Sequence, residues 1–479
     1  MEHLHFIGIG GTGMSAVARI LLEMGYRVSG SDLAASEMTE RLARLGARIS
    51  IGHHPENLQD ADLVVISSAV PEDNEELVTA RARGIPVLHR AEMLGRLMGR
   101  YRSVAVAGSH GKTTTTSMIS VILERLGLDP TVVIGGELHD IGGNAKLGRG
   151  EHFVAEADES DGSFLKLRPA VVVVTNIDDD HLNNYGGQME RLAAAFLQFI
   201  NGVPPDGVAV LCLDDPWVRR LRPQITAAQI TYGLGEGAEL VARNVQLLSL
   251  GAVAEVYRGG QHLGSLRLQV PGRHNVSNAL AALGVGLFLG LPFAEMAAAL
   301  STFTGVERRF QTLALVDGIR VVDDYGHHPS EIKATLAAAR RAAAGRLIVI
   351  FQPHRYTRTL LLAEEFGGAF TGADEIIVTD IYPAGEEPIP GVSGHLIAAA
   401  IARHKGRPVS YLTDTEEIIA RIFDLVRPGD LVLTIGAGNV WQIGTDLARR
   451  LAGRKGVGDG GFTTVGETAY DTARRSEGE

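Results

Sequence analysis

The first hundred residues alternate between short apolar runs, typical of buried strands, and segments with helical apolar spacing. The predicted strands cover residues 3–10, 26–32, 62–70 and 85–90, and the predicted helices cover residues 14–25, 38–47 and 74–84. Strands that are apolar throughout and separated by helices indicate a parallel sheet covered on both faces. We therefore predict an α/β domain here.

The same alternation resumes near Tyr101 and again near Arg309. Between these starts, residues 233–270 form short runs separated by turn residues, which predicts antiparallel strands. The third segment is predicted to contain strands at 320–325, 346–353, 375–382 and 430–438. The last segment, 453–479, is rich in glycine, threonine and charge and lacks apolar periodicity, so we expect it to be disordered.

Composition narrows the class of protein. A chain of 479 residues is long enough for two to four domains. A net charge of -11 without a long basic run argues against nucleic acid or an anionic membrane as the main partner. The single cysteine, Cys212, requires no oxidising compartment. The N-terminus has no basic n-region and its apolar run breaks into glycines, so we expect no signal peptide, and the apolar stretches are too short for a membrane span. We expect a cytoplasmic enzyme, as a monomer or a homodimer.

The segment GSHGKTTTT, residues 108–116, follows a predicted strand and opens a predicted helix. This placement suits a phosphate-binding loop, because small residues let backbone N–H groups approach phosphate oxygens at a helix N-terminus. Lys112 could reach the terminal phosphates of a nucleotide and Thr113 could bind magnesium. Although the loop is shorter than the common eight-residue motif, it predicts an ATP-driven, Mg²⁺-dependent enzyme.

A second glycine turn, with Gly8, Gly10 and Gly13, follows the first predicted strand, and Asp32 ends the next one. Alone, this spacing is compatible with NAD, with another pyrophosphate such as that of a UDP-sugar, or with a tight turn that binds nothing.

Polar segments follow several other predicted strands and could contribute to a site. Residues 156–164 and 176–187 are rich in acids and, beside Thr113, could complete the coordination of magnesium; alone, they could equally be solvated turns. Asn275 could either cap a helix or contact a ligand. Two loops rich in His, Arg and Tyr, at 323–331 and 351–358, follow strands of the third segment, where arginines could bind a carboxylate or phosphate.

Together these segments resemble the Mur ligase family, the ATP-dependent amide-forming enzymes of peptidoglycan precursor synthesis. The matching segments, in family order, are GIGGTGMS, GSHGKTTTT, EADESDGSF, NIDDDH, GRHNVSNALAA, GVERRFQ, DDYGHHPSEI and FQPHRYTRT. The last two most resemble the members that join L-alanine to UDP-N-acetylmuramate. The resemblance implies an α/β fold of three domains: a Rossmann-like UDP-sugar domain at 1–98, a P-loop-type ATPase domain with a mostly parallel sheet at 99–308, and a Rossmann-like amino-acid domain at 309–452.

The resemblance also implies roles for individual residues. Catalysis would involve Lys112, His327 and His354, and the metal would be bound by Thr113, Glu156 and His181. ATP would be bound by Gly108, Ser109, His110, Gly111, Lys112, Thr113, Thr114, His274, Asn275, Asn278, Arg309 and Asp323. The UDP-sugar would be bound by Gly10, Gly11, Thr12, Gly13, Asp32, His53, Ser67, Tyr325, Arg355 and Arg358.

The implied reaction activates the lactyl carboxylate with the γ-phosphoryl group of ATP, after which the amine of L-alanine displaces phosphate from the acyl phosphate. His327 or His354 could accept the amine proton. Three alternatives stay open: a related ligase that adds a peptide or another amino acid, an NAD oxidoreductase built on the first glycine turn, and a nucleotide-gated binding protein without chemistry. The second alternative leaves the phosphate loop and the acid-rich segments unexplained.

Overall fold

The computed structural model describes residues 2–138, 143–180 and 182–453, which fall into two compact units. The first unit contains residues 1–245, 253–268 and 274–306, and the second contains 246–252, 269–273 and 307–479. Two of our expectations, the metal ligand His181 and a disordered tail, concern residues 181 and 454–479, which lie outside the described residues.

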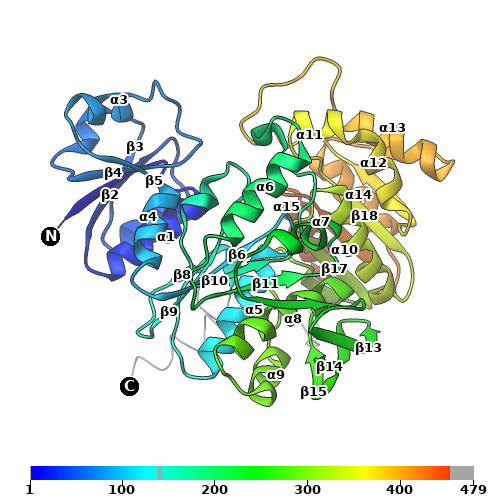
Figure 1. Cartoon of the computed structure of the whole chain (residues 1–479). Helices are drawn as coiled ribbons and strands as arrows, with labels where there is room; N and C mark the ends of the chain where they lie inside the picture. The colour runs from blue at the N-terminus through cyan, green and yellow to red at the C-terminus, as the bar shows by residue number, and fades with distance from the viewer. Residues whose placement is uncertain (1, 139–142, 181, 454–479) are drawn as a thin grey trace, which may run out of the picture. The chain divides into compact units, whose positions relative to one another are not determined.

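The N-terminal part of the first unit is a five-stranded sheet in the order β3-β2-β1-β4-β5, and every pairing is parallel (Figure 1). Its strands are β1 (His3–Ile7), β2 (Arg27–Asp32), β3 (Arg48–Ile51), β4 (Leu63–Ile66) and β5 (Val87–His89). Its helices are α1 (Thr12–Glu23), α2 (Glu37–Arg44), η1 (Pro55–Leu58), α3 (Glu75–Ala82) and α4 (Arg90–Met98). The expected boundary at 98/99 falls between α4 and the next strand.

A ten-stranded sheet follows, in the order β15-β14-β13-β12-β11-β10-β6-β9-β7-β8. Its strands are β6 (Arg102–Ala107), β7 (Thr131–Leu138), β8 (Gly143–Lys146), β9 (His152–Glu156), β10 (Val171–Val174), β11 (Val208–Cys212), β12 (Gln229–Gly233), β13 (Leu240–Leu248), β14 (Gly251–Arg258) and β15 (Gln261–Leu268). The pairings from β7 through β12 are parallel, and β8 pairs antiparallel with β7. Two-residue connections join β13, β14 and β15, as the expected antiparallel hairpins require.

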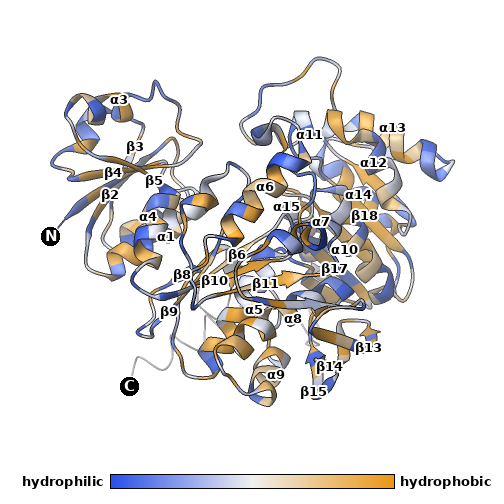
Figure 2. Ribbon diagram, in the orientation of Figure 1, coloured by the Kyte–Doolittle hydropathy of each residue, from blue (hydrophilic) through white to orange (hydrophobic). Residues whose placement is uncertain are grey.

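The helices around this sheet are α5 (Lys112–Arg125), η3 (Ser163–Lys166), η4 (Leu182–Tyr185), α6 (Met189–Ile200), α7 (Pro216–Leu221), η5 (Arg222–Gln224), α8 (Arg273–Phe288) and α9 (Phe293–Ser301). The central parallel strands β10 and β11 are apolar and buried at every position. Figure 2 shows this as a hydrophobic interior under helices with mixed faces. Such strands need cover on both faces, which places the polar site residues at the strand ends.

The second unit is built on a six-stranded sheet in the order β16-β17-β21-β18-β19-β20. Its strands are β16 (Gln311–Val316), β17 (Ile319–Asp324), β18 (Leu347–Phe351), β19 (Glu375–Val378), β20 (Ser410–Tyr411) and β21 (Leu431–Ile435). Its helices are α10 (Pro329–Ala342), α11 (Tyr356–Leu361), α12 (Ala363–Gly367), η6 (Gly368–Phe370), α13 (Gly394–Lys405), α14 (Thr415–Leu425) and α15 (Trp441–Gly453). One core joins the sheet to α10, α12 and α13, and the other joins it to α14 and α15.

The expected fold class is confirmed, because three mostly parallel sheets are covered by helices. The sequence analysis did not anticipate β16, which pairs antiparallel with β17 at the edge of its sheet. Within the described part of the chain, no helix combines the length and apolar character that a membrane crossing needs.

Candidate active site

The phosphate loop lies between the end of β6 and the start of α5. Gly108 has φ of +137° and Gly111 has φ of +81°, both in the region that favours glycine. A Cβ atom on Gly108 would lie 2.1 Å from the Thr175 hydroxyl, and one on Gly111 would lie 2.7 Å from Oδ1 of Asn278. Both glycines are therefore needed for the backbone path and for the close approach of neighbouring side chains.

The segment that follows β10 supports this loop. The N–H of His110 donates to Oδ1 of Asn176 (2.9 Å), and the hydroxyl of Thr175 donates to the carbonyl of His110 (2.6 Å). The N–H of Asp178 donates to the Ser109 hydroxyl (2.8 Å). Parallel β6 and β10 bring these residues together, whereas His181 was the only residue of the 176–187 segment that the sequence prediction gave a role.

Helix α5 begins at Lys112 with no side-chain cap, although α2, α3, α4 and α7 are each capped by a side chain. The N–H groups of its first turn, which includes Thr113 and Thr114, therefore point out of the helix end without a side-chain acceptor. An uncapped helix N-terminus beside a glycine loop fits a phosphate group, because the amides and the helix dipole favour an anion there.

The Lys112 ammonium folds back over the loop. Its Nζ donates to the carbonyl of Gly108 (2.5 Å) and to both carboxylate oxygens of Glu159 (2.9 and 3.0 Å). Burial alone would lower the pKa of Lys112, but the charges of Glu159, Asp158 and Glu156 raise it overall. Lys112 is therefore a protonated donor at the position where a terminal phosphate would need one.

Glu159 is a functional residue that the sequence analysis missed. Its side chain is almost fully buried against Lys112, and burial raises the pKa of this carboxyl group more than the Lys112 charge lowers it. The acid-rich segment that follows β9 was recognised, but Glu156 was the only one of its acids given a role. No local pattern indicates that Glu159, three residues later, is the acid that pairs with Lys112.

Two of the three expected metal ligands lie beside the same stretch of β7. Oε1 of Glu156 accepts a hydrogen bond from the N–H of Gly135 (2.6 Å). The methyl group of Thr113 would lie 3.1 Å from a Cβ atom on Gly136. A hydroxyl and a carboxylate next to a phosphate loop are oxygen donors of the kind Mg²⁺ prefers, so these residues fit the ion.

Helix α8 carries the residues of the first unit that were expected to contact the nucleotide. Asn278 lies against Gly111 of the loop, and its Nδ2 donates to Oδ1 of Asn275 (3.2 Å). Both asparagines are buried, whereas His274 is exposed. The two amides thus lie beside the phosphate loop.

The N-terminal glycine turn lies between β1 and α1, and α1 also begins without a side-chain cap, at Gly11–Thr12. The N–H groups of Gly8 and Ile9 donate to the carbonyl of Ser31, and the N–H of Gly10 donates to Oδ2 of Asp32 (2.8 Å). Asp32 therefore shapes the turn through its own contacts, whatever else it binds.

A cation that the sequence analysis missed lies at the same helix end. A Cβ atom on Gly13 would lie 2.3 Å from Nη1 of Arg90, the first residue of α4. The Arg90 guanidinium also lies 3.6 Å from Oδ2 of Asp158. An arginine at an uncapped helix N-terminus fits a pyrophosphate.

The remaining UDP candidates of this domain lie at the same carboxyl edge of the sheet. Ser67 directly follows β4. His53 follows β3, and its Nδ1 lies 2.9 Å from the Ser31 hydroxyl. Gly52 donates to the carbonyl of Asp32 (2.8 Å), which ties the His53 loop to the glycine turn.

In the second unit, the segments before and after β17 enclose a cluster of arginines and acids. Nε of Arg308 lies 3.1 Å from Oδ2 of Asp323, which is fully buried and also accepts from the Thr434 hydroxyl. The guanidinium groups of Arg308 and Arg309 lie 4.9 and 5.2 Å from the ring centre of Tyr325. Burial raises the pKa of Asp323, and it raises the pKa of Asp324 to about 6.

The residues of the two His-rich loops that were expected to be catalytic or to bind the UDP-sugar lie together. The rings of His327 and His354 are 5.4 Å apart, and Tyr325 contacts His327 at 5.5 Å. Nη1 of Arg358, a buried residue of α11, lies 3.2 Å from Nδ1 of His354. The cluster combines imidazoles and cations at the carboxyl ends of β17 and β18.

Arg355 joins this cluster in an unusual conformation. Its φ is +69°, rare for a residue with a side chain, and its Nε is buried without a hydrogen-bond partner in the described part of the chain. A buried guanidinium nitrogen that lacks an acceptor fits a carboxylate ligand.

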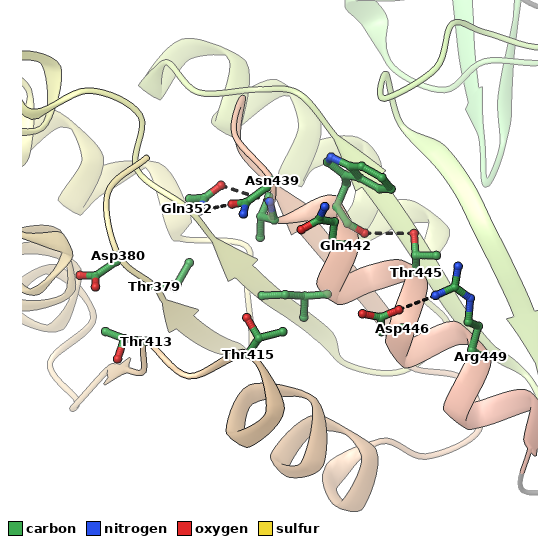
Figure 3. Close-up of a pocket in the computed structure, with 13 residues that line it drawn as sticks. Gln352, Thr379, Asp380, Thr413, Thr415, Asn439, Gln442, Thr445, Asp446 and Arg449 are labelled. Carbon is green, nitrogen blue, oxygen red and sulfur yellow. Dashed lines mark hydrogen bonds and ion pairs between the residues drawn. The ribbon is translucent and has the colours of Figure 1, made fainter. Parts of the chain in front are cut away.

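The second unit also contains a cavity of about 470 Å³ (Figure 3). It lies among the residues that follow β18 and β19 and the first turns of α14 and α15, with Gln352, Thr379, Asp380, Asn439 and Asp446 in its lining. Gln352 donates to Oδ1 of Asn439 (2.8 Å), as drawn in Figure 3. None of the residues given a role above is in its described lining, although Gln352 belongs to the loop that carries His354.

Comparison with known proteins identifies the family. Three models match successive parts of the chain: Mur ligase family, catalytic domain (residues 3–102); Mur ligase middle domain (106–286); and Mur ligase, glutamate ligase domain (308–438). A protein of Pelotomaculum thermopropionicum named UDP-N-acetylmuramate–L-alanine ligase is 55% identical, over 95% of this chain and 99% of its own. A protein of Syntrophotalea carbinolica with the same name is 54% identical, over 94% and 98%.

Solved structures agree with this result. A UDP-N-acetylmuramate–alanine ligase from Thermotoga maritima superposes with a TM-score of 0.82 at 32% identity, over 95% of this chain and all of its own. A murein peptide ligase from Psychrobacter arcticus shares the fold, with a TM-score of 0.70 at 24% identity. With three family models matched in order and relatives similar over nearly the whole length, the chain belongs to the Mur ligase family.

Proposed function

We propose that this chain is an ATP-dependent ligase that joins L-alanine to the lactyl carboxylate of UDP-N-acetylmuramate, a step of peptidoglycan precursor synthesis. The observation that carries the proposal is the near-complete match to relatives named for this reaction, eight of which are 50–55% identical. The phosphate loop with its buried Lys112–Glu159 pair supports the ATP-dependent part independently.

At the nucleotide end, ATP supplies the phosphoryl group that activates the carboxylate, and Mg²⁺ supplies positive charge. Lys112 and the first-turn amides of α5 would bind the terminal phosphates, and Thr113 and Glu156 would bind the metal. Lys112 must exchange Glu159 for phosphate, because its ammonium has three protons and is already surrounded by acceptors. Asn275 and Asn278 would contact the nucleotide beside Gly111.

At the amino-acid end, Arg355 and Arg358 would bind a carboxylate. The buried Nε of Arg355 lacks a hydrogen-bond partner in the described structure, so a bound carboxylate would satisfy it. Tyr325 would pack beside His327 and limit the size of the amino-acid side chain.

The hydrogen bonds favour His327 over His354 as the acceptor of the amine proton. Nδ1 of His327 lies 3.1 Å from the carbonyl of Tyr325, so it carries the hydrogen and Nε2 carries the lone pair. In His354 the lone pair is on Nδ1, because Arg358 donates to that nitrogen, and the guanidinium charge opposes protonation there. We therefore propose His327, rather than His354, as the general base.

We further propose that the enzyme works in the cytoplasm, as a monomer or a homodimer, with small-molecule substrates as its partners. The test is a reaction with the purified chain, ATP, Mg²⁺ and UDP-N-acetylmuramate, scored for phosphate release and for product mass. L-Alanine should give turnover, and glycine, L-serine, D-glutamate and a tripeptide should give less. Turnover only with the tripeptide, or with no acceptor of the panel, would contradict the proposal.

A further inference from the structure

A buried carboxylate lies behind the residues expected to bind the UDP group. Glu76, in the first turn of α3, is fully buried. Its Oε1 accepts from Nδ2 of Asn57 (2.6 Å) and from the N–H of His54 (3.2 Å). Its Oε2 accepts from the Ser31 hydroxyl (2.5 Å) and lies 3.4 Å from Nε2 of His5. One side chain thus joins α3, the end of β2 and the loop that carries His53.

The contacts imply that Glu76 is ionised. Burial alone would raise the pKa of Glu76, but the hydrogen bonds from His5, Ser31 and Asn57 lower it overall. An ionised carboxylate only accepts hydrogen bonds. The single hydroxyl proton of Ser31 must therefore point to Glu76.

This assignment decides which nitrogen of His53 carries the hydrogen. Because the Ser31 proton points to Glu76, the Ser31 oxygen can only accept from Nδ1 of His53, 2.9 Å away. In the neutral ring, Nε2 then carries the lone pair. About a fifth of the His53 side chain (18%) remains exposed, so the ring reaches the surface of the UDP end.

A second chain of hydrogen bonds reaches the same carboxylate from the opposite side. Arg27 donates to Nδ1 of His3, and Ser29 links Nε2 of His3 to Nδ1 of His5, each at 2.8 Å. Burial and the charge of Arg27 lower the pKa of His3, which favours its neutral form. With Arg27 as the donor to Nδ1 of His3, every proton of this chain can point toward Glu76, although Oδ1 of Asp60 also lies 3.2 Å from that nitrogen.

We propose that Glu76 is a positioning residue that fixes His53 in the Nδ1–H tautomer, so that Nε2 accepts a hydrogen bond from the nucleotide. His53 then recognises a donor group, a sugar hydroxyl or a ring N–H, rather than a pyrophosphate oxygen. This inference rests on the proposed function, since it assigns the UDP-sugar as the ligand.

The substitution Glu76→Gln tests the tautomer directly. The introduced NH₂ group cannot lie at the Oε1 position, where the backbone N–H of His54 already donates. At the Oε2 position it would donate to Ser31, whose hydroxyl would turn and donate to Nδ1 of His53. The variant should therefore convert His53 from the Nδ1–H to the Nε2–H tautomer.

The first measurement is the ring ¹⁵N spectrum of the full-length chain, labelled at histidine, at pH 8, where an ordinary imidazole is neutral. The His53 signals are assigned by their loss in His53→Ala. We expect Nδ1–H in the native chain and Nε2–H in Glu76→Gln. A native His53 in the Nε2–H form, or one unchanged by the substitution, overturns the inference without reference to activity.

The second measurement is the affinity for UDP and UDP-N-acetylmuramate, with turnover kinetics. Glu76→Gln should weaken both ligands roughly tenfold or more, because the lone pair and donor no longer match. The KM for ATP and kcat at saturating UDP-sugar should stay near the native values. In a His53→Ala background, Glu76→Gln should have no further effect on affinity; an equal further loss would mean that Glu76 acts through the fold alone.

Two variants complete the design. Ser31→Ala removes the link between Glu76 and His53 and should reproduce the loss of affinity even if Glu76→Gln folds poorly. Glu75→Gln alters the exposed neighbour of Glu76 and should leave affinity unchanged. If the native chain binds no UDP-sugar, the proposed function fails, whereas the tautomer measurement still decides the role of Glu76.

Discussion

The two glycine turns of the first unit have the same strand–turn–helix geometry but differ in the charged side chains beside them. Each connects a strand of a parallel sheet to a helix without a side-chain cap, β1 to α1 and β6 to α5. The central turn adds the Lys112 ammonium, which bonds to the buried Glu159. The N-terminal turn has no such lysine; its amide at Gly10 bonds to Asp32, and Arg90 approaches from α4.

A buried acid supports each turn, and the two acids differ in what surrounds them. Glu76 accepts hydrogen bonds from a hydroxyl, an amide and a backbone N–H, and its pKa is lowered. Glu159 faces the Lys112 ammonium, and burial raises the pKa of Glu159. The first arrangement fixes a geometry, whereas the second can be exchanged for phosphate. We infer that the N-terminal turn binds a group that stays and the central turn one that reacts.

The largest expected effect separates the chemistry of the two turns. Lys112→Ala removes the cation at the terminal phosphates, so turnover should fall by about 10³-fold or more. Binding of UDP-N-acetylmuramate should be unchanged, because the N-terminal turn does not use this lysine. Phosphate release and UDP-sugar titration measure the two effects. Retained turnover would contradict the role of Lys112.

A matched pair of alanine substitutions compares the backbone of the two turns. Gly108→Ala places a Cβ atom 2.1 Å from the Thr175 hydroxyl at φ of +137°, so it should cost about 3 kcal/mol of unfolding free energy. Gly8 has φ of +76° and no atom within 4 Å of an added Cβ, so Gly8→Ala should cost about 1 kcal/mol. Chemical denaturation measures the loss of unfolding free energy in each variant. Equal losses would show that the central turn is not more closely packed than the N-terminal turn.

The sequence predicted both turns, because glycine spacing between a strand and a helix is a local signal. It did not predict the acids behind them. In the sequence, Glu76 is one of two neighbouring acids in the first turn of a predicted helix, a position that is usually exposed. It is buried only because α3 packs on the sheet. Glu159 and Glu156 lie in one acid-rich segment, and the pairing of Glu159 with Lys112, 47 positions away in the chain, depends on the parallel alignment of β6 and β9.

Glu159→Gln tests whether phosphate can replace the acid. Removing one partner of a buried ion pair should lower the free energy of unfolding of the nucleotide-free chain by roughly 3–5 kcal/mol. A nonhydrolysable ATP analogue with Mg²⁺ should restore most of this loss, because its phosphates supply the missing negative charge. Thermal unfolding with and without the analogue measures the difference. An equal loss under both conditions would show that Glu159 has only a structural role.

The smallest expected effect concerns pH and the N-terminal turn. A lowered pKa means that ionised Glu76 stabilises the fold above its ordinary pKa of 4.5 and that this contribution is lost as the pH falls through the folded-state value. The free energy of unfolding should therefore differ between the native chain and Glu76→Gln at pH 7, and the difference should shrink below pH 4.5. His5 and His53 face the same carboxylate. The stability of the native chain and of the Glu76→Gln variant is therefore measured from pH 8 to pH 3, so that the effect of Glu76 is separated from that of the histidines.

If the pKa of Glu76 were raised, as it is at Glu159, the stability difference would change with pH in the opposite direction, and the native chain would become relatively more stable as the pH falls. That outcome would mean that the acid beside each turn could be replaced by a phosphate group. The two turns would then not differ in the way inferred above, as one fixed site and one reacting site.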